Sequence, residues 1–89
     1  MEEIHITIRG HVQGVFFRAL VRDKAGILGI KGFVRNLPNG DVEIMAQGSE
    51  KALNELVKLC RKGPLGAKVD KIKTKKQKIK EKFSSFEIK

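Results

Sequence analysis

Cysteine, long apolar runs and a leader pattern are scarce or missing in this sequence of 89 residues. One cysteine, Cys60, excludes an internal disulfide framework and is typical of a reducing cytosol, so we expect a cytoplasmic protein. No apolar run approaches the roughly 20 residues that span a membrane. The start, Met1-Glu2-Glu3, lacks the basic and then apolar pattern of a signal peptide. Cys60 falls on the apolar stripe of an expected helix, and we predict that it is a small core residue.

Tryptophan and tyrosine are absent, and phenylalanine occurs five times. Domains that bind single-stranded RNA on a sheet stack bases on exposed aromatic side chains. Because Phe17 and Phe86 fall at expected core positions, too few aromatic rings remain for such a platform. The composition therefore disfavours a nucleic-acid-binding module, which stays open as the alternative from a different functional class.

The positive charge is concentrated near the C-terminal end. The formal net charge is +9, and residues 67–89 hold nine Lys but only three Asp or Glu. Lysines at this density are typical of a solvated edge strand or loop that is kept from pairing with other chains. We predict an edge strand in this segment, with RNA binding as the weaker interpretation.

The spacing of apolar residues predicts strands and helices in alternation. Ser49 is a good N-cap for the second helix, and Gly63-Pro64 ends it. The Asn39-Gly40 pair is typical of a hairpin turn. The expected elements are a strand over about 3–10, a helix over 17–28, a strand over 30–37, a strand over 42–48, a helix over about 50–62, a strand around Val69 and Ile72, and a final strand including Phe83, Phe86 and Ile88.

This order predicts a single α+β domain over residues 1–89, a ferredoxin-like βαββαβ sandwich with two helices on one face of an antiparallel sheet. A right-handed crossover makes the first two strands parallel, with the third between them. Their C-terminal ends then lie at the same edge of the sheet. Arg18 follows the first of these ends and Asn36 lies near the second, so we expect the two side chains at one edge.

The loop Gly10–Arg18 joins the first strand to the first helix. Such a loop can turn several backbone N–H groups toward one point beside the positive end of the helix dipole, which suits an anion, above all phosphate. Arg18 stands in the first helical turn, where a cation is mildly unfavourable, and could add a two-pronged grip on phosphate. The alternative is that the glycines make a tight turn and Arg18 is a solvated charge. No Gly-Lys-[Ser/Thr] follows, so the loop is not a Walker A motif.

Few side chains remain for catalysis. The sequence offers no Ser/His/Asp order, no metal-ligand spacing and no pair of carboxylates aimed at one point, and we predict Asp23 and Asp41 to be surface charges. Asn36 could orient a water but could not act as its base, because an amide does not accept a proton at useful pH. An acyl phosphate suits this set, since its carboxylate leaves without a general acid and phosphoryl transfer needs mainly positioning and charge stabilisation.

At these residues the sequence resembles the acylphosphatase family. Its first motif is similar to Gly10-x-Val12-Gln13-Gly14-Val15-x-Phe17-Arg18, and its second to Gly32-Phe33-Val34-Arg35-Asn36 with Gly40-x-Val42 and Gly48. Cys60-Arg61-x-Gly63-Pro64, Ala67-x-Val69 and Phe86-x-Ile88 extend the resemblance over essentially the whole chain. Phe33 stands where the family often has tryptophan, and the lysine-rich segment is also a departure.

The resemblance implies hydrolysis of acyl phosphates without a metal or other cofactor. We also expect a monomer, although the sequence itself does not fix the oligomeric state. It implies that Arg18 is the catalytic arginine, that Asn36 orients the attacking water, and that the amides of Gln13, Gly14, Val15 and Phe16 hold phosphate together with Arg18. Small acyl phosphates are then the partners, with no membrane. A third interpretation is an accessory domain of a larger carbamoyl-transferring protein. The end of the chain at Lys89 argues against this interpretation. The sequence does not describe a pocket for the acyl group.

Overall fold

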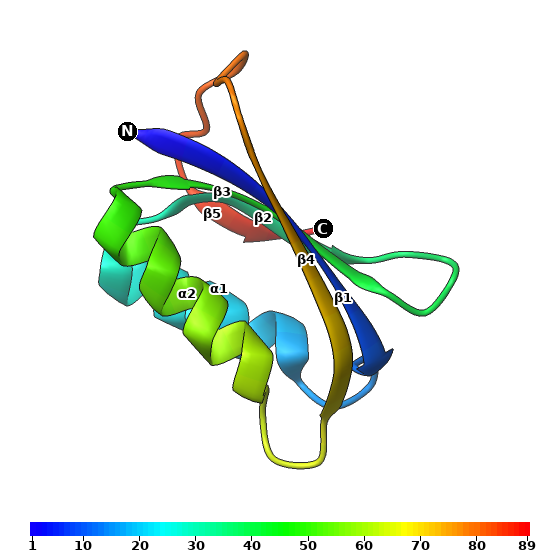
Figure 1. The fold of residues 1–89 in the computed structure, drawn as a ribbon. Coiled ribbons are helices and arrows are strands. Elements are labelled where there is room, and N and C mark those ends of the chain that lie inside the picture. The colour runs from blue at the N-terminus through cyan, green and yellow to red at the C-terminus, as the bar shows by residue number, and fades with distance from the viewer.

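The computed structural model describes all residues, 1–89, as two helices packed on one face of a five-stranded sheet (Figure 1). The alternation and stripes of the sequence place these elements close to the predicted bounds. They are β1 (Glu2–His11), α1 (Phe17–Leu28), β2 (Lys31–Asn36), β3 (Val42–Gly48), α2 (Glu50–Lys62), β4 (Lys68–Gln77) and β5 (Phe86–Ile88).

The strand order in the sheet is β4-β1-β3-β2-β5. The strand β3 pairs antiparallel with both β1 and β2, so these two strands run parallel with β3 between them, as predicted. The strand β4 is the antiparallel partner of β1 at one edge. At the other edge the short β5 pairs parallel with β2, which makes the complete sheet mixed where the sequence predicted an antiparallel one. The ferredoxin-like class is confirmed.

The core lies between the sheet and the helices. Ile4, Ile6 and Ile8 of β1 are buried against both helices, because alternate residues of a strand face the same side. Ser49 caps α2 by accepting a hydrogen bond from the Ala52 amide at 3.1 Å, as predicted. Cys60 is a buried core residue, and burial raises the pKa of its thiol to about 12, which keeps it protonated and unreactive.

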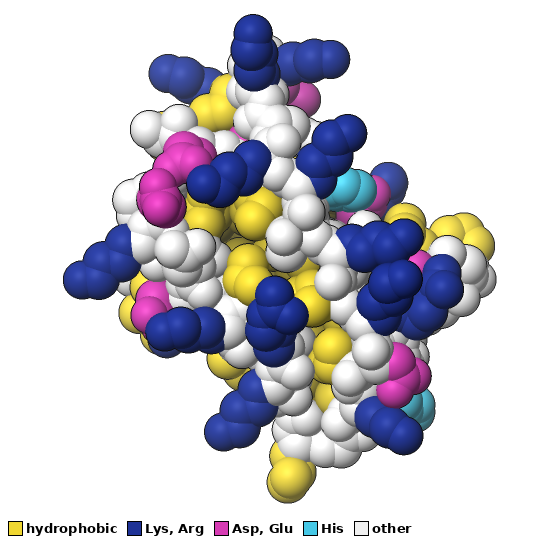
Figure 2. Space-filling view, viewed as in Figure 1, with side chains coloured by type: hydrophobic (Ala, Val, Ile, Leu, Met, Phe, Trp, Pro, Cys, Tyr) yellow, Lys and Arg dark blue, Asp and Glu magenta, His cyan; other side chains and the backbone are white.

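The first part of the lysine-rich segment forms the edge strand β4, which is ten residues long, and Lys78, Lys80 and Lys82 lie in the loop that follows it. Its residues are mostly exposed, and Figure 2 shows Lys and Arg side chains around this edge and apolar side chains between α2 and β4. The prediction of a solvated edge strand is confirmed, although the many lysines kept the sequence from predicting the length of this strand.

Phe83 precedes β5 and packs edge-on against Phe33 at 5.8 Å between ring centroids. No helix here combines the length and the apolar character needed to cross a membrane.

One sequence prediction about a charged residue is wrong. Asp41 is buried, with 5 % of its surface exposed, and is not a surface charge. Its carboxylate accepts hydrogen bonds from the Asn39 amide at 3.2 Å and from Arg9 Nε at 3.5 Å. These partners offset the cost of removing the charge from water. Asp23 is exposed beside Arg22, as predicted.

Gly32 allows β2 and β3 to approach closely, and its replacement should be costly. Its φ of 142° is rarely adopted by other residues, and a Cβ there would overlap the backbone carbonyl of Met45. We expect Gly32→Ala to lower the free energy of unfolding by about 2–4 kcal/mol in urea denaturation. Gly26→Ala is the matched control, because Gly26 lies inside α1 with open space around it, and it should stabilise by about 0.5–1 kcal/mol. Equal effects of the two changes would contradict this explanation.

Candidate active site

The loop between β1 and α1 contains two residues in the left-handed backbone region. They are Gly14, with a φ of 75°, and Phe16, with a φ of 63°, the one residue other than glycine in this region. Phe16 is also the N-cap of α1, and no side chain caps the helix there. The first turn of α1 contains no acidic residue, so nothing in the sequence offsets the positive end of the helix dipole.

The backbone N–H groups of this loop are free. None of the amides of Gln13, Gly14, Val15 and Phe16 donates to another backbone oxygen, and the α1 cap has no side-chain acceptor. Free amides next to an uncapped helix start are unusual in folded proteins, where most such donors are paired. The arrangement suits an anion that accepts hydrogen bonds from several N–H groups at once.

Arg18 and Asn36 line one pocket of about 290 Å³ with this loop. Arg18 is half-buried, and none of the six ion pairs in the protein involves it. No carboxylate therefore neutralises the charge that Arg18 brings to the pocket lining. The remaining lining residues are largely apolar; the full set is Val12, Gly14, Phe16, Phe17, Arg18, Ala19, Asn36 and Ile88.

Asn36 is the last residue of β2, and its side-chain amide has no partner in the protein. Its Oδ1 atom is buried and accepts no hydrogen bond. Leaving a buried polar group unpaired costs about 1–3 kcal/mol, so such a group calls for an explanation in the chemistry of the site.

Gln13 ties the loop to the turn that follows Asn36. Its Nε2 atom donates to the carbonyl oxygens of Leu37 at 2.8 Å and of Asp41 at 2.9 Å. The Leu37 amide also donates to the Asp41 carbonyl at 2.8 Å, which closes the turn. The side chain of Gln13 thus fixes the distance between the free amides and the end of β2.

The predicted site residues fall into two groups. Gly14, Phe16, Arg18 and Asn36 line the pocket together, as the topology had predicted for Arg18 and Asn36. Gln13 and Val15 are not among the lining residues, because Val15 packs against the core and the Gln13 side chain reaches the turn. Sequence reasoning missed Ile88 as a lining residue and the side-chain contacts of Gln13. The protein holds no group of three or more His, Cys, Asp or Glu side chains that could bind a metal ion.

Comparison with known proteins identifies the family. The family model described as Acylphosphatase matches residues 4–88. An acylphosphatase of Methylococcus capsulatus is 38% identical over 88 residues, covering 99% of this chain and 96% of the relative. One of Caldivirga maquilingensis is 42% identical over 86 residues, covering 96% and 90%. The crystal structure of acylphosphatase from Bacillus subtilis superposes with a TM-score of 0.95 at 35% identity, covering 99% and 98%.

These matches and the fold define a small α+β hydrolase. The chain belongs to the acylphosphatase family, and it is an enzyme that hydrolyses acyl phosphates. The resemblance found in the sequence motifs is therefore confirmed.

Proposed function

We propose that the enzyme binds the phosphoryl group of its substrate with the amides of Gln13, Gly14, Val15 and Phe16 and the guanidinium of Arg18. Asn36 orients the water that attacks phosphorus. The observation that carries this proposal is one pocket in which Gly14 and Phe16, from the loop with free amides, meet an arginine without an ion pair and an unpaired amide side chain. Each of these groups lacks a partner inside the protein and suits a different part of a phosphoryl-transfer reaction.

The lining of the pocket favours water as the nucleophile. It contains no Ser, Thr, Cys, His, Asp or Glu, so no side chain there can form a covalent intermediate or take a proton as a base. A substrate hydrolysed by such a site needs a leaving group that departs without protonation. The carboxylate of an acyl phosphate meets this requirement, whereas the alkoxide of an ordinary phosphate ester does not.

The reaction balances with these groups alone. The oxygen of water forms a bond to phosphorus as the bond between phosphorus and the acyl oxygen breaks. The acyl group leaves as a carboxylate with the bonding electrons, and the proton of the water passes to a phosphate oxygen. Arg18 and the loop amides stabilise the charge on the phosphoryl oxygens through charge-assisted hydrogen bonds. No step requires a metal ion.

The proposed mechanism needs no group from a second chain, so the enzyme could act as a monomer. The free Cys60 supports activity in the cytoplasm.

Product inhibition tests the anion site. We expect inorganic phosphate and sulfate to inhibit the hydrolysis of benzoyl phosphate competitively, because they fit the same N–H groups and guanidinium as the substrate. The measurement is a series of initial rates with and without EDTA, and the rates should not differ. Loss of activity in EDTA with recovery in magnesium would overturn the metal-free mechanism.

Replacement of Gln13 tests the link between the loop and the end of β2. Gln13→Ala removes the side-chain donor from the carbonyls of Leu37 and Asp41, which keep their backbone donors, and it frees the loop from the turn. We therefore expect kcat to fall by about 10-fold and the phosphate inhibition constant to rise. Gln77→Ala is the control, because Gln77 donates to Glu3 away from the pocket. It should lower stability without lowering kcat. Full activity in Gln13→Ala would show that the link does not position the site.

A further inference from the structure

Phe16 breaks two local rules at once. Its left-handed φ of 63° disfavours any residue with a Cβ, at a cost of order 1 kcal/mol, and its side chain is 84 % exposed. Glycine would satisfy the backbone there without strain, as it does at Gly14. The backbone geometry therefore does not explain why this position has a phenyl side chain.

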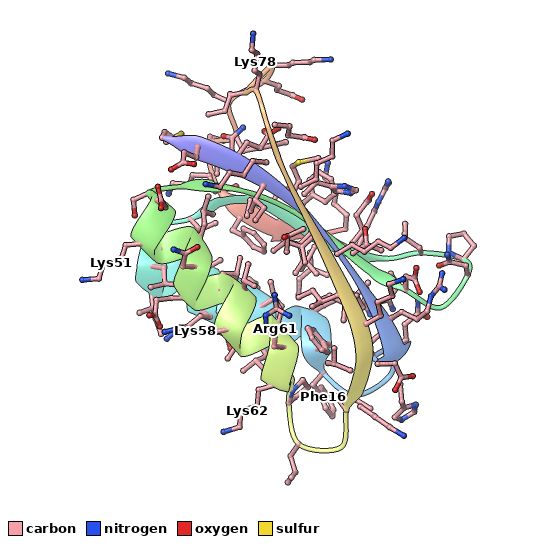
Figure 3. The ribbon with its side chains drawn as sticks, viewed as in Figure 1. Phe16, Lys51, Lys58, Arg61, Lys62 and Lys78 are labelled. Carbon is pink, nitrogen blue, oxygen red and sulfur yellow. The ribbon has the colours of Figure 1, made fainter.

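Phe16 lines the same pocket as Arg18 and Asn36. It is the N-cap residue of α1, and Figure 3 labels it at the loop before this helix. Ile88 of β5 lines this pocket as well and is 36 % exposed. A partly exposed aliphatic residue and an exposed aromatic ring thus stand beside the polar groups. Two other large exposed apolar residues, Ile27 and Leu65, are not part of the lining.

We propose that Phe16 and Ile88 form a subsite for the acyl group and that the enzyme prefers acyl phosphates with apolar, above all aromatic, acyl groups. This inference rests on the proposed function, in which the phosphoryl end is held by the loop amides and Arg18. An acyl group attached to that phosphate must extend past the remaining lining, and this lining is apolar apart from Asn36.

The chemistry of the lining sets the preference. Contact with a phenyl or alkyl group removes the exposed surfaces of Phe16 and Ile88 from water, and an aromatic acyl group can also pack against the ring. The lining contains no charged side chain besides Arg18, which the phosphate occupies. A second negative charge on the acyl group would therefore lose water without gaining a partner.

Selectivity between two substrates measures the subsite. We expect Phe16→Ala to lower the ratio of kcat/KM for benzoyl phosphate to kcat/KM for acetyl phosphate by about 5- to 10-fold, and Ile88→Ala to lower it by about 3- to 5-fold. Phe16→Leu keeps an apolar side chain and should restore part of the ratio. The ratio cancels the intrinsic reactivity of each substrate, since the same two are compared in every variant.

A second measurement reports binding without chemistry. Benzylphosphonate should inhibit the wild-type enzyme more strongly than methylphosphonate, and Phe16→Ala should remove most of that difference. Ile27→Ala is the matched control, because Ile27 is 81 % exposed on the same helix but away from the pocket. It should change neither ratio.

The outcomes separate this inference from the mechanism on which it rests. An unchanged benzoyl-to-acetyl ratio and an unchanged phosphonate ratio in both Phe16→Ala and Ile88→Ala would overturn the acyl subsite, even if inorganic phosphate still inhibits. If inorganic phosphate fails to inhibit the wild-type enzyme, the anion site itself is wrong. Thermal unfolding of the Phe16 variants should match the wild type, since the exposed ring contributes little to the core.

Discussion

Arg18→Lys should reduce kcat/KM for acyl phosphate hydrolysis by about 10²–10³-fold or more, although it keeps the positive charge. Lysine presents a compact ammonium in place of a planar fork and cannot make two parallel hydrogen bonds to phosphoryl oxygens. Loss of one well-placed donor to a transition-state oxygen has an effect of this size in other enzymes. The inhibition constant for inorganic phosphate should rise as well, because in the proposed mechanism Arg18 contacts the phosphate in the ground state as well as in the transition state.

Stability measurements distinguish this loss from damage to the fold. Arg18 makes no ion pair and stands in the first turn of α1, where its charge opposes the helix dipole. Arg18→Gln should therefore keep or raise the free energy of unfolding, by up to about 0.3–1 kcal/mol, while activity collapses. Arg22→Lys, one turn further along the same helix, is the matched control and should leave activity intact. Near-normal turnover in Arg18→Lys would remove Arg18 from the mechanism.

Most of the fold follows from local sequence signals. The alternation of Ile4, Ile6 and Ile8, the stripes of the two helices and the Asn39-Gly40 turn were sufficient to predict the order of the first three strands. The length of β4 did not follow, because most of its residues are lysines or other polar residues and only Val69 and Ile72 pack against the core. An edge strand packs fewer residues into the core, and so its alternation is weak. The parallel pairing of β5 is a contact between residues more than 50 positions apart in sequence, such as Gly32 and Phe86.

The site was only partly predictable from the sequence, because some of its contacts join residues that are far apart along the chain. Topology brings Arg18 and Asn36 together, because both follow the ends of parallel strands, and this needs no side-chain detail. The role of the Gln13 side chain depends on two carbonyl oxygens 24 and 28 positions away, which no local pattern specifies. The burial of Asp41 depends likewise on Arg9, a residue of another strand. A hydrogen bond to a backbone carbonyl does not depend on the identity of the residue that supplies it, so the sequence does not predict such a contact.

Unpaired polar groups distinguish the active-site end of this protein from the rest of it. At the opposite end of the sheet, the buried carboxylate of Glu3 accepts hydrogen bonds from Gln47 at 2.7 Å and Gln77 at 2.6 Å. At the pocket, by contrast, the amide of Asn36 and the guanidinium of Arg18 have no such partners. A fold that satisfies its buried polar groups elsewhere leaves these free for the substrate and water, which makes Asn36 the sharpest test of the mechanism.

Asn36→Ala should lower kcat by about 10²–10³-fold while KM and the phosphate inhibition constant change little. In the proposed mechanism the amide positions the attacking water in line with the bond that breaks, so its contribution should appear mainly in the transition state. Positioning can supply several kcal/mol to such a step, and each ~1.4 kcal/mol lost lowers the rate about tenfold. Because Oδ1 is buried without a partner, removing the amide should not lower the free energy of unfolding by more than the loss of its packing.

Two further replacements at this position separate geometry from charge. Asn36→Gln keeps the amide but displaces it by one methylene, and it should not restore kcat, because the water would lie out of line. Asn36→Asp is nearly isosteric but adds a negative charge beside an anionic substrate, so it should raise KM more than Asn36→Ala does. Steady-state kinetics with benzoyl phosphate, together with phosphate inhibition, measures both effects. If Asn36→Ala weakens phosphate binding as strongly as it lowers turnover, Asn36 holds the phosphate itself and another group must position the water.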